Sequence, residues 1–72
     1  MKAGYAEGDR DLTPRMRETL QGVARGETAR EQARRLNLAE SSVKNVLAAA
    51  RARLGAGTSG EAAATALRRG LL

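Results

Sequence analysis

The feature that most constrains this chain is the stretch from residue 33 to 46, ARRLNLAESSVKNV, which predicts one helix, a tight turn and a second helix. Asn37 stands where the first helix must stop, because asparagine is, after glycine, the residue that most readily takes the left-handed conformation that ends a helix. Ala33, one turn earlier, is small enough to let a second helix cross closely over it. Leu36 and Leu38 flank the turn with apolar side chains that such a crossing would bury. The sequence therefore predicts two helices that cross at a short turn.

Apolar residues recur at helical spacing in the second of these helices, which we expect over residues 40–54. The stripe predicted to point inward consists of Val43, Val46, Leu47, Ala50 and Leu54. The residues left on the outer side and its flanks include Lys44, Asn45, Ala48 and Arg51. This is the helix-turn-helix pattern, in which the second helix is built to enter a DNA major groove.

A helix is also predicted before this motif, over residues 14–25. Thr13 can cap it with its hydroxyl and Pro14 suits the first helical position. Gly26 should end it. Its predicted buried face consists of Met16, Leu20, Val23 and Ala24.

The first helix of the motif should begin at Ala29, because Thr28 and Glu31 have the spacing of a capping box. Glu31 and Arg35 are expected to form an ion pair between successive turns of this helix. The helix over residues 40–54 has no clear cap, and either Ala39 or Ser41 must serve.

A last, short helix is predicted over residues 61–69, after a loop of small residues at 56–60. Leu71 and Leu72 can then fold back on the core. Residues 1–11 lack an apolar period and are expected to be a flexible arm. The predicted fold class is therefore all-α, with four helices in a single domain over residues 12–72.

Composition limits the chemistry. A chain of 72 residues makes one small domain. It has no cysteine and no histidine, so we expect no disulfide, no metal site and no cofactor, in keeping with a reducing cytoplasm. No apolar run is long enough to cross a membrane, and we expect a cytoplasmic protein. Ser41 and Ser42 have no histidine to activate them, so we expect no enzyme.

The formal net charge is +5, which favours a polyanionic partner because Lys and Arg release the counterions condensed on phosphates. A GC-rich genome would explain an Arg-, Ala- and Gly-rich composition equally well. The placement of the cations is therefore more informative than their number.

With the helices placed, residues 12–72 resemble the LuxR-type DNA-binding domain, the four-helix output module also found in NarL-like response regulators and in GerE. The resemblance rests on five segments in order: Leu12-Thr13-Pro14-Arg15, Ala33-Arg34-Arg35-Leu36, Ser42-Val43-Lys44-Asn45, Arg53-Leu54-Gly55 and Ala66-Leu67-Arg68-Arg69-Gly70-Leu71. Four positions depart from the family pattern. This chain has Met16 where the family usually has a carboxylate and Gln32 where it has an isoleucine. It has Ala39 where the family has a capping hydroxyl and Val46 where it has a histidine.

The resemblance implies that the helix over residues 40–54 reads the major groove, with Lys44 and Asn45 at bases and phosphates and the Ser42 hydroxyl near the backbone. Arginines on the preceding helix are candidates for phosphate contact. The full set of candidate DNA-contacting residues is Ser41, Ser42, Lys44, Asn45, Ala48, Arg51, Arg30, Arg34 and Arg35.

The resemblance also implies a homodimer contact through the fourth helix, which would use Ala62, Ala63 and Ala66. The alternative, that these three alanines pack in the core of the single chain, is equally consistent with the sequence. Gln32 has two alternatives as well. Either it is buried, where an amide without partners costs about 1–3 kcal/mol, or it faces outward and contacts something.

We therefore expect a sequence-specific duplex-DNA-binding transcriptional regulator, or the output domain of one, that inserts residues 40–54 into the major groove. Two alternatives stay open. The first is a small helix-turn-helix interaction module that docks on RNA polymerase or another regulator. The second is a structural or toxin-antitoxin-like partner protein, which predicts tight hetero-association and weak DNA affinity.

Overall fold

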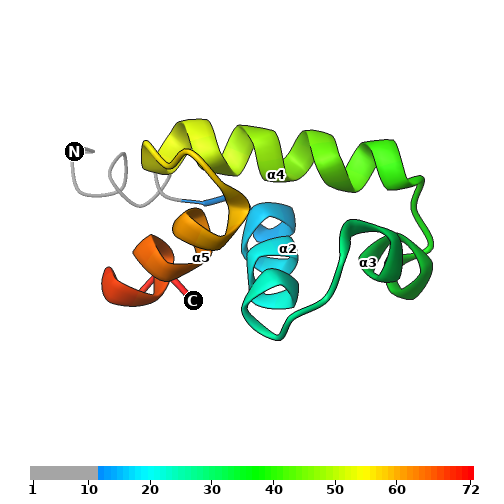
Figure 1. Ribbon diagram of the computed structural model, residues 1–72, viewed down its shortest axis with the longest axis horizontal. Helices are drawn as coiled ribbons and strands as arrows, with labels where there is room; N and C mark the ends of the chain where they lie inside the picture. Colours follow the sequence, from blue (N-terminus) through cyan, green and yellow to red (C-terminus); the bar gives the residue numbers. More distant parts are fainter. Residues whose placement is uncertain (1–11) are drawn as a thin grey trace.

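The computed structural model describes residues 12–72, which form four α-helices and no strand (Figure 1). The helices are α2 (Pro14–Ala24), α3 (Ala29–Leu36), α4 (Glu40–Leu54) and α5 (Ser59–Arg68). In Figure 1, α4 lies along the top, with α5, α2 and α3 beneath it from left to right. α4 packs against each of the other three helices, and α2 packs against α5. The predicted all-α fold is confirmed, whereas the predicted arm, residues 1–11, lies outside the described residues.

Side chains set the start of α2 and α3 as predicted. The Oγ1 atom of Thr13 accepts a hydrogen bond from the Met16 amide at 3.1 Å. Thr28 and Glu31 form the predicted capping box, in which Thr28 Oγ1 accepts from the Glu31 amide at 3.1 Å and Glu31 Oε1 accepts from the Thr28 amide at 2.8 Å. Asn37 follows α3 in the left-handed conformation, with φ 59° and ψ 47°. The turn of the motif is therefore built by the residue that the sequence indicated.

The start of α5 differs from the prediction. The helix begins at Ser59 rather than at Glu61, because Thr58 caps it. Thr58 Oγ1 accepts from the Glu61 amide at 3.0 Å, and Glu61 Oε1 accepts from the Thr58 amide at 3.2 Å. This is a second capping box with the spacing of the one at Thr28, inside the segment predicted to be a loop. α4 has the predicted bounds, and Ala39 precedes it without a side-chain cap.

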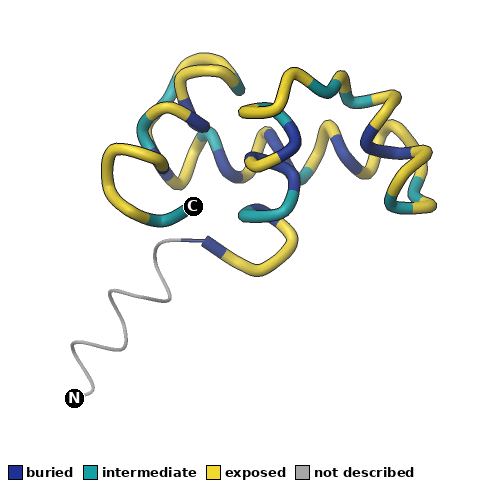
Figure 2. The backbone as a smooth tube through the Cα atoms, turned by 90° about the horizontal axis from the view of Figure 1, so that it is seen from below, coloured by how far each residue is buried: buried dark blue, intermediate teal, exposed yellow. Residues whose placement is uncertain are grey.

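The core lies where the four helices meet, and Figure 2 shows buried stretches of the tube facing one another there. Its buried apolar residues are Leu12, Met16, Leu20, Ala33, Val43, Leu47, Ala50, Leu54, Ala62, Ala63 and Ala66. Val23 and Val46, both predicted to be buried, are half-buried at its edge, as are Leu71 and Leu72. Ala24 was predicted to be buried and is exposed, whereas Thr19 is fully buried and donates to the Met16 carbonyl at 3.0 Å.

Ala62, Ala63 and Ala66 belong to the core of the single chain, with exposed fractions of 0%, 4% and 0%. Their small side chains let the backbone of α5 approach α2 and α4 closely. The structure thus supports the core alternative and corrects the predicted dimer contact. Side chains enclosed within one chain leave no surface for a second one.

Gln32 is also buried, with an exposed fraction of 0%. Neither its Nε2 nor its Oε1 atom has a hydrogen-bond partner among the described residues. Of the two alternatives for Gln32, burial is therefore confirmed. A fully desolvated amide without partners is unfavourable, so this position lowers the stability of the domain.

Candidate nucleic-acid interface

The outer face of α4 is a stripe of exposed residues that points away from the core. Its members, spaced four, three and four residues apart, are Ser41, Asn45, Ala48 and Ala52, and all are exposed. They lie opposite the buried stripe of Val43, Leu47, Ala50 and Leu54. In Figure 1 no other described segment covers the upper side of α4. Within residues 12–72, this side of α4 is therefore open to a partner.

Asn45 is the one polar group of base-reading type in the middle of this stripe. Its amide makes no hydrogen bond within residues 12–72. An asparagine amide can bond the N6 and N7 atoms of adenine together, and small neighbours allow a helix backbone to approach base edges closely. Ala48 and Ala49 are such neighbours and are exposed. Ala49 lies one turn beyond Asn45 and was not among the predicted contacts, although the same helical spacing indicates it.

Lys44 and Ser42 flank the stripe. The Nζ atom of Lys44 lies 3.3 Å from Glu40 Oε2, and the two side chains are 65% and 45% exposed. An exposed pair one turn apart is weak and screened by salt, so Lys44 can exchange Glu40 for a phosphate. Ser42 lies exposed in the first turn of α4, where no side chain caps the free amides. Uncapped amides at a helix N-terminus favour an anion such as phosphate.

The three candidate arginines of α3 are not equivalent. Arg35 binds the carboxylate of Glu27 through both Nε (3.0 Å) and Nη2 (2.8 Å). The predicted pair of Arg35 with Glu31 is wrong, because Glu31 caps its own helix. Arg30 and Arg34 are exposed and have no ion pair within residues 12–72. Arg30 and Arg34 are thus better placed than Arg35 to contact a phosphate.

Glu27 is a residue that the sequence did not single out. The hydrogen bond from Arg35 lowers the pKa of the Glu27 carboxyl, and the positive charges of Arg35 and Arg25 act in the same direction against partial burial. The same pairing raises the pKa of Arg35. Arg25 lies 3.6 Å from the same carboxylate. This cluster ties the loop before α3 to its last turn across a spacing that no helical repeat indicates.

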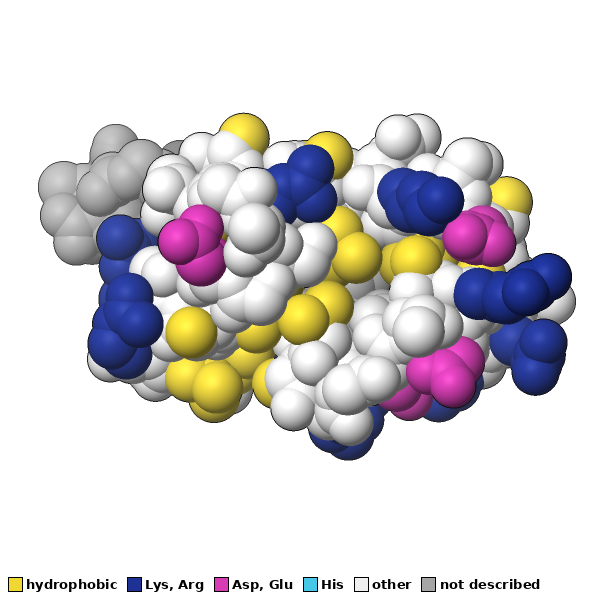
Figure 3. All heavy atoms as spheres, in the orientation of Figure 1, with side chains coloured by type: hydrophobic (Ala, Val, Ile, Leu, Met, Phe, Trp, Pro, Cys, Tyr) yellow, Lys and Arg dark blue, Asp and Glu magenta, His cyan; other side chains and the backbone are white. Residues whose placement is uncertain are grey.

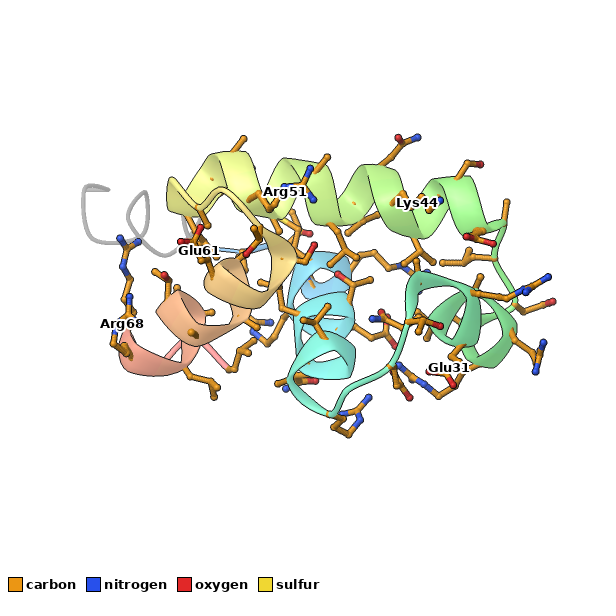
Figure 4. The ribbon with its side chains drawn as sticks, viewed as in Figure 1. Glu31, Lys44, Arg51, Glu61 and Arg68 are labelled. Atoms are coloured by element: carbon orange, nitrogen blue, oxygen red, sulfur yellow. The ribbon has the colours of Figure 1, made fainter. Side chains whose placement is uncertain are left out.

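Arg51 differs from the other candidates of α4 in its burial. It is half-buried on the flank of α4 that faces α5, and its Nη1 atom donates to Ser59 Oγ at 3.3 Å. Figure 4 shows Arg51 and Lys44 on the same side of α4, two turns apart. Arg51 therefore lies at the border of the outer face rather than within it.

Comparison with known proteins identifies the family. The model of a family described as bacterial regulatory proteins, luxR family, matches residues 10–66. The chain belongs to the LuxR family. The match spans α2, α3, α4 and most of α5, so the LuxR-type helix-turn-helix motif consists here of α3, the turn at Asn37 and α4. No curated protein matches the chain.

Membership of the LuxR family makes the chain a helix-turn-helix domain of the DNA-binding regulatory type. Within residues 12–72, no group of three or more acidic, cysteine or histidine side chains gathers where it could hold a metal ion. None of the helices described is both long enough and apolar enough to span a membrane.

Proposed function

We propose that this LuxR-family protein is a transcriptional regulator that binds duplex DNA sequence-specifically, with α4 in the major groove. The observation that carries the proposal is the stripe along α4, where Asn45 has no partner within the described chain and the surrounding residues are small and exposed. A helix with such a face can lie deep in a groove and still present a base-reading amide. This role places the protein with the DNA in the cytoplasm.

In this arrangement Asn45 reads bases, and Ala48 with Ala49 provides close apolar contact. Lys44 and the first turn of α4, with Ser41 and Ser42, bind phosphates along one strand. Arg30 and Arg34 on α3 bind phosphates where that helix crosses the backbone. Contacts to phosphate position the domain, while the contacts of α4 supply specificity.

Selection of bound duplexes from a random pool tests the proposal. We expect enrichment of one motif and an affinity for random duplex that falls steeply as salt rises. Docking on RNA polymerase or another regulator is the alternative function. Failure to enrich any motif, together with salt-independent and negligible binding to random duplex, would favour that alternative.

A homodimer is part of the proposal, but through a different part of α5 from the three buried alanines. Leu67, the large hydrophobic residue left exposed within residues 12–72, is 56% exposed on α5. A two-fold contact through the surface around Leu67 would place two copies of α4 on neighbouring half-sites. Sedimentation on a two-fold duplex should show two chains bound for the wild type and one for Leu67→Ser. Two bound chains for both proteins would exclude Leu67 from the contact.

A further inference from the structure

Beside the proposed DNA contact lies a cleft of which only Lys44 takes part in that contact. This cleft lies between α2, the start of α3, α4 and the start of α5, and its volume is about 410 Å³. Val23, Ala29 and Leu47 form its apolar part. Figure 3 shows hydrophobic side chains in the hollowed middle of this face, with Lys and Arg side chains above them. Volume and lining fall within the range of small-molecule sites.

The charges around the cleft do not cancel. Glu27 lines it, but its carboxylate is held by Arg35 at 2.8 Å and lies 3.6 Å from Arg25. Lys44 also lines it and has the weak, exposed pair with Glu40. Arg51 has only a neutral partner, because its one hydrogen bond within residues 12–72 goes to Ser59 Oγ at 3.3 Å. The cleft thus holds a half-buried cation that no carboxylate of the described chain neutralises.

The groups near Arg51 add to the preference for an anion. Ser59 lines the cleft and is the first residue of α5, so the positive end of that helix lies at the same place. The Ser59 hydroxyl accepts from Arg51 and still has its own proton to donate. A guanidinium presents a planar set of donors that fits a carboxylate with two parallel hydrogen bonds.

We propose that this cleft binds a small organic monoanion with an apolar body, of the class of short- and medium-chain carboxylates. The carboxylate binds Arg51 and the Ser59 hydroxyl, and the apolar body lies against Val23 and Leu47. Because Arg51 borders the outer face of α4, the bound anion neutralises a cation beside the DNA contact and weakens duplex binding. That last effect rests on the proposed function, whereas binding of the anion does not.

Titration of the full chain with three probes, followed by amide chemical shifts, tests the site without DNA. Hexanoate has both the charge and the chain, hexan-1-ol has only the chain, and acetate has only the charge. We expect hexanoate to saturate with a dissociation constant on the order of 1 mM and to shift the amides of Ala29, Leu47 and Ser59. Hexan-1-ol and acetate should each bind about tenfold more weakly. Equal binding of hexanoate and hexan-1-ol would overturn the proposal, as would shifts spread over the whole surface without saturation.

Two arginine variants provide a matched comparison. Arg51→Gln should lower the affinity for hexanoate about tenfold and leave that for hexan-1-ol unchanged. Arg68→Gln is the control, because Arg68 also donates to a hydroxyl, that of Thr65 at 3.1 Å, but does not line the cleft. Unchanged affinity in Arg51→Gln, or an equal loss in both variants, would contradict the site.

A second substitution keeps the test decisive if Arg51→Gln loses its helical circular dichroism. Ser59→Ala should weaken hexanoate binding and preserve α5, because Thr58 rather than Ser59 caps that helix. Normal hexanoate binding by a folded Ser59→Ala protein would then overturn the proposal. In the presence of a selected duplex, hexanoate should weaken DNA binding by the wild type. An anion that binds without this effect would refute only the link to DNA.

Discussion

The side-chain amide of Gln32 on α3 packs against the backbone of Gly22 on α2. A Cβ atom on residue 22 would come within 2.6 Å of Gln32 Cδ and 2.8 Å of Nε2. The absence of a side chain at Gly22 therefore makes the space that the amide occupies. This fit accommodates the volume of Gln32 but not its polarity, because neither polar atom has a partner within residues 12–72.

Replacing the amide by an apolar group of similar shape should stabilise the domain. Gln32→Met removes two buried polar atoms without partners, and we expect the free energy of unfolding to rise by about 1–3 kcal/mol. Urea denaturation measures the change. Gln21→Met makes the same substitution at an exposed site of α2 and should change the stability by less than about 0.5 kcal/mol. A loss of stability in Gln32→Met would mean that the amide has a partner in solution.

A methyl group at residue 22 should destabilise the domain. Gly22→Ala places a Cβ against the Gln32 amide and against Glu27 Oε1, at 2.5 Å, so we expect a loss of about 1–3 kcal/mol. Gly60→Ala, in α5, is the control, because a Cβ atom at residue 60 would meet only Thr58 Oγ1, at 3.9 Å. The two sites are coupled if Gly22→Ala costs less in a Gln32→Ala background. Additive effects in the double variant would refute the contact.

Acid should weaken the cluster around Glu27. Because Arg35 lowers the pKa of the folded-state carboxyl, this group contributes stability above its unfolded value of about 4.3 and loses it as the pH falls through the lower folded value. The difference in unfolding free energy between wild type and Glu27→Gln should therefore be constant near pH 7 and shrink below about pH 5. In an Arg35→Gln background the pH dependence should largely vanish. A difference that grows on acidification would reverse the sign of this account.

Salt dependence should separate the arginines of α3. Arg30→Ala and Arg34→Ala each remove one proposed phosphate contact, and each should flatten the slope of log affinity against log salt by about 0.9. Arg35→Ala should change the slope less, because its guanidinium is bound to Glu27 at 2.8 Å. Duplex titrations between low and moderate salt measure the slopes. A large change of the slope for Arg35→Ala, with none for Arg30→Ala and Arg34→Ala, would contradict this assignment of the phosphate contacts.

Local signals in the sequence predicted most of the fold. Thr13, Thr28 and Asn37 fix helix ends through their own side chains or backbone conformation, so their roles depend on few other residues. Thr58 and Glu61 also have the spacing of a capping box, but the small residues around Thr58 led to the prediction of a loop there. The outer face of α4 also followed from the sequence, because helical spacing alone places Asn45 opposite the core.

What the sequence could not predict depends on contacts between helices. Gln32 is buried because Gly22 leaves room for it on another helix, and no spacing along the chain indicates that fit. Arg35 in the last turn of α3 pairs with Glu27 in the loop before that helix, and the sequence did not indicate this pairing either. The alanines of α5 suited a core and an interface equally well, and only their enclosure by α2 and α4 distinguishes the two.

The central claim is that Asn45 on α4 reads DNA bases, and one comparison tests it most directly. The affinities of wild type and Asn45→Ala should be measured on the selected duplex and on random duplex at one salt concentration. We expect a loss of about 1–3 kcal/mol on the selected duplex and much less on random DNA, because only base contacts distinguish the two. Equal losses on both would assign Asn45 to the phosphate backbone. No loss on either would contradict the claim that this face of α4 enters the major groove.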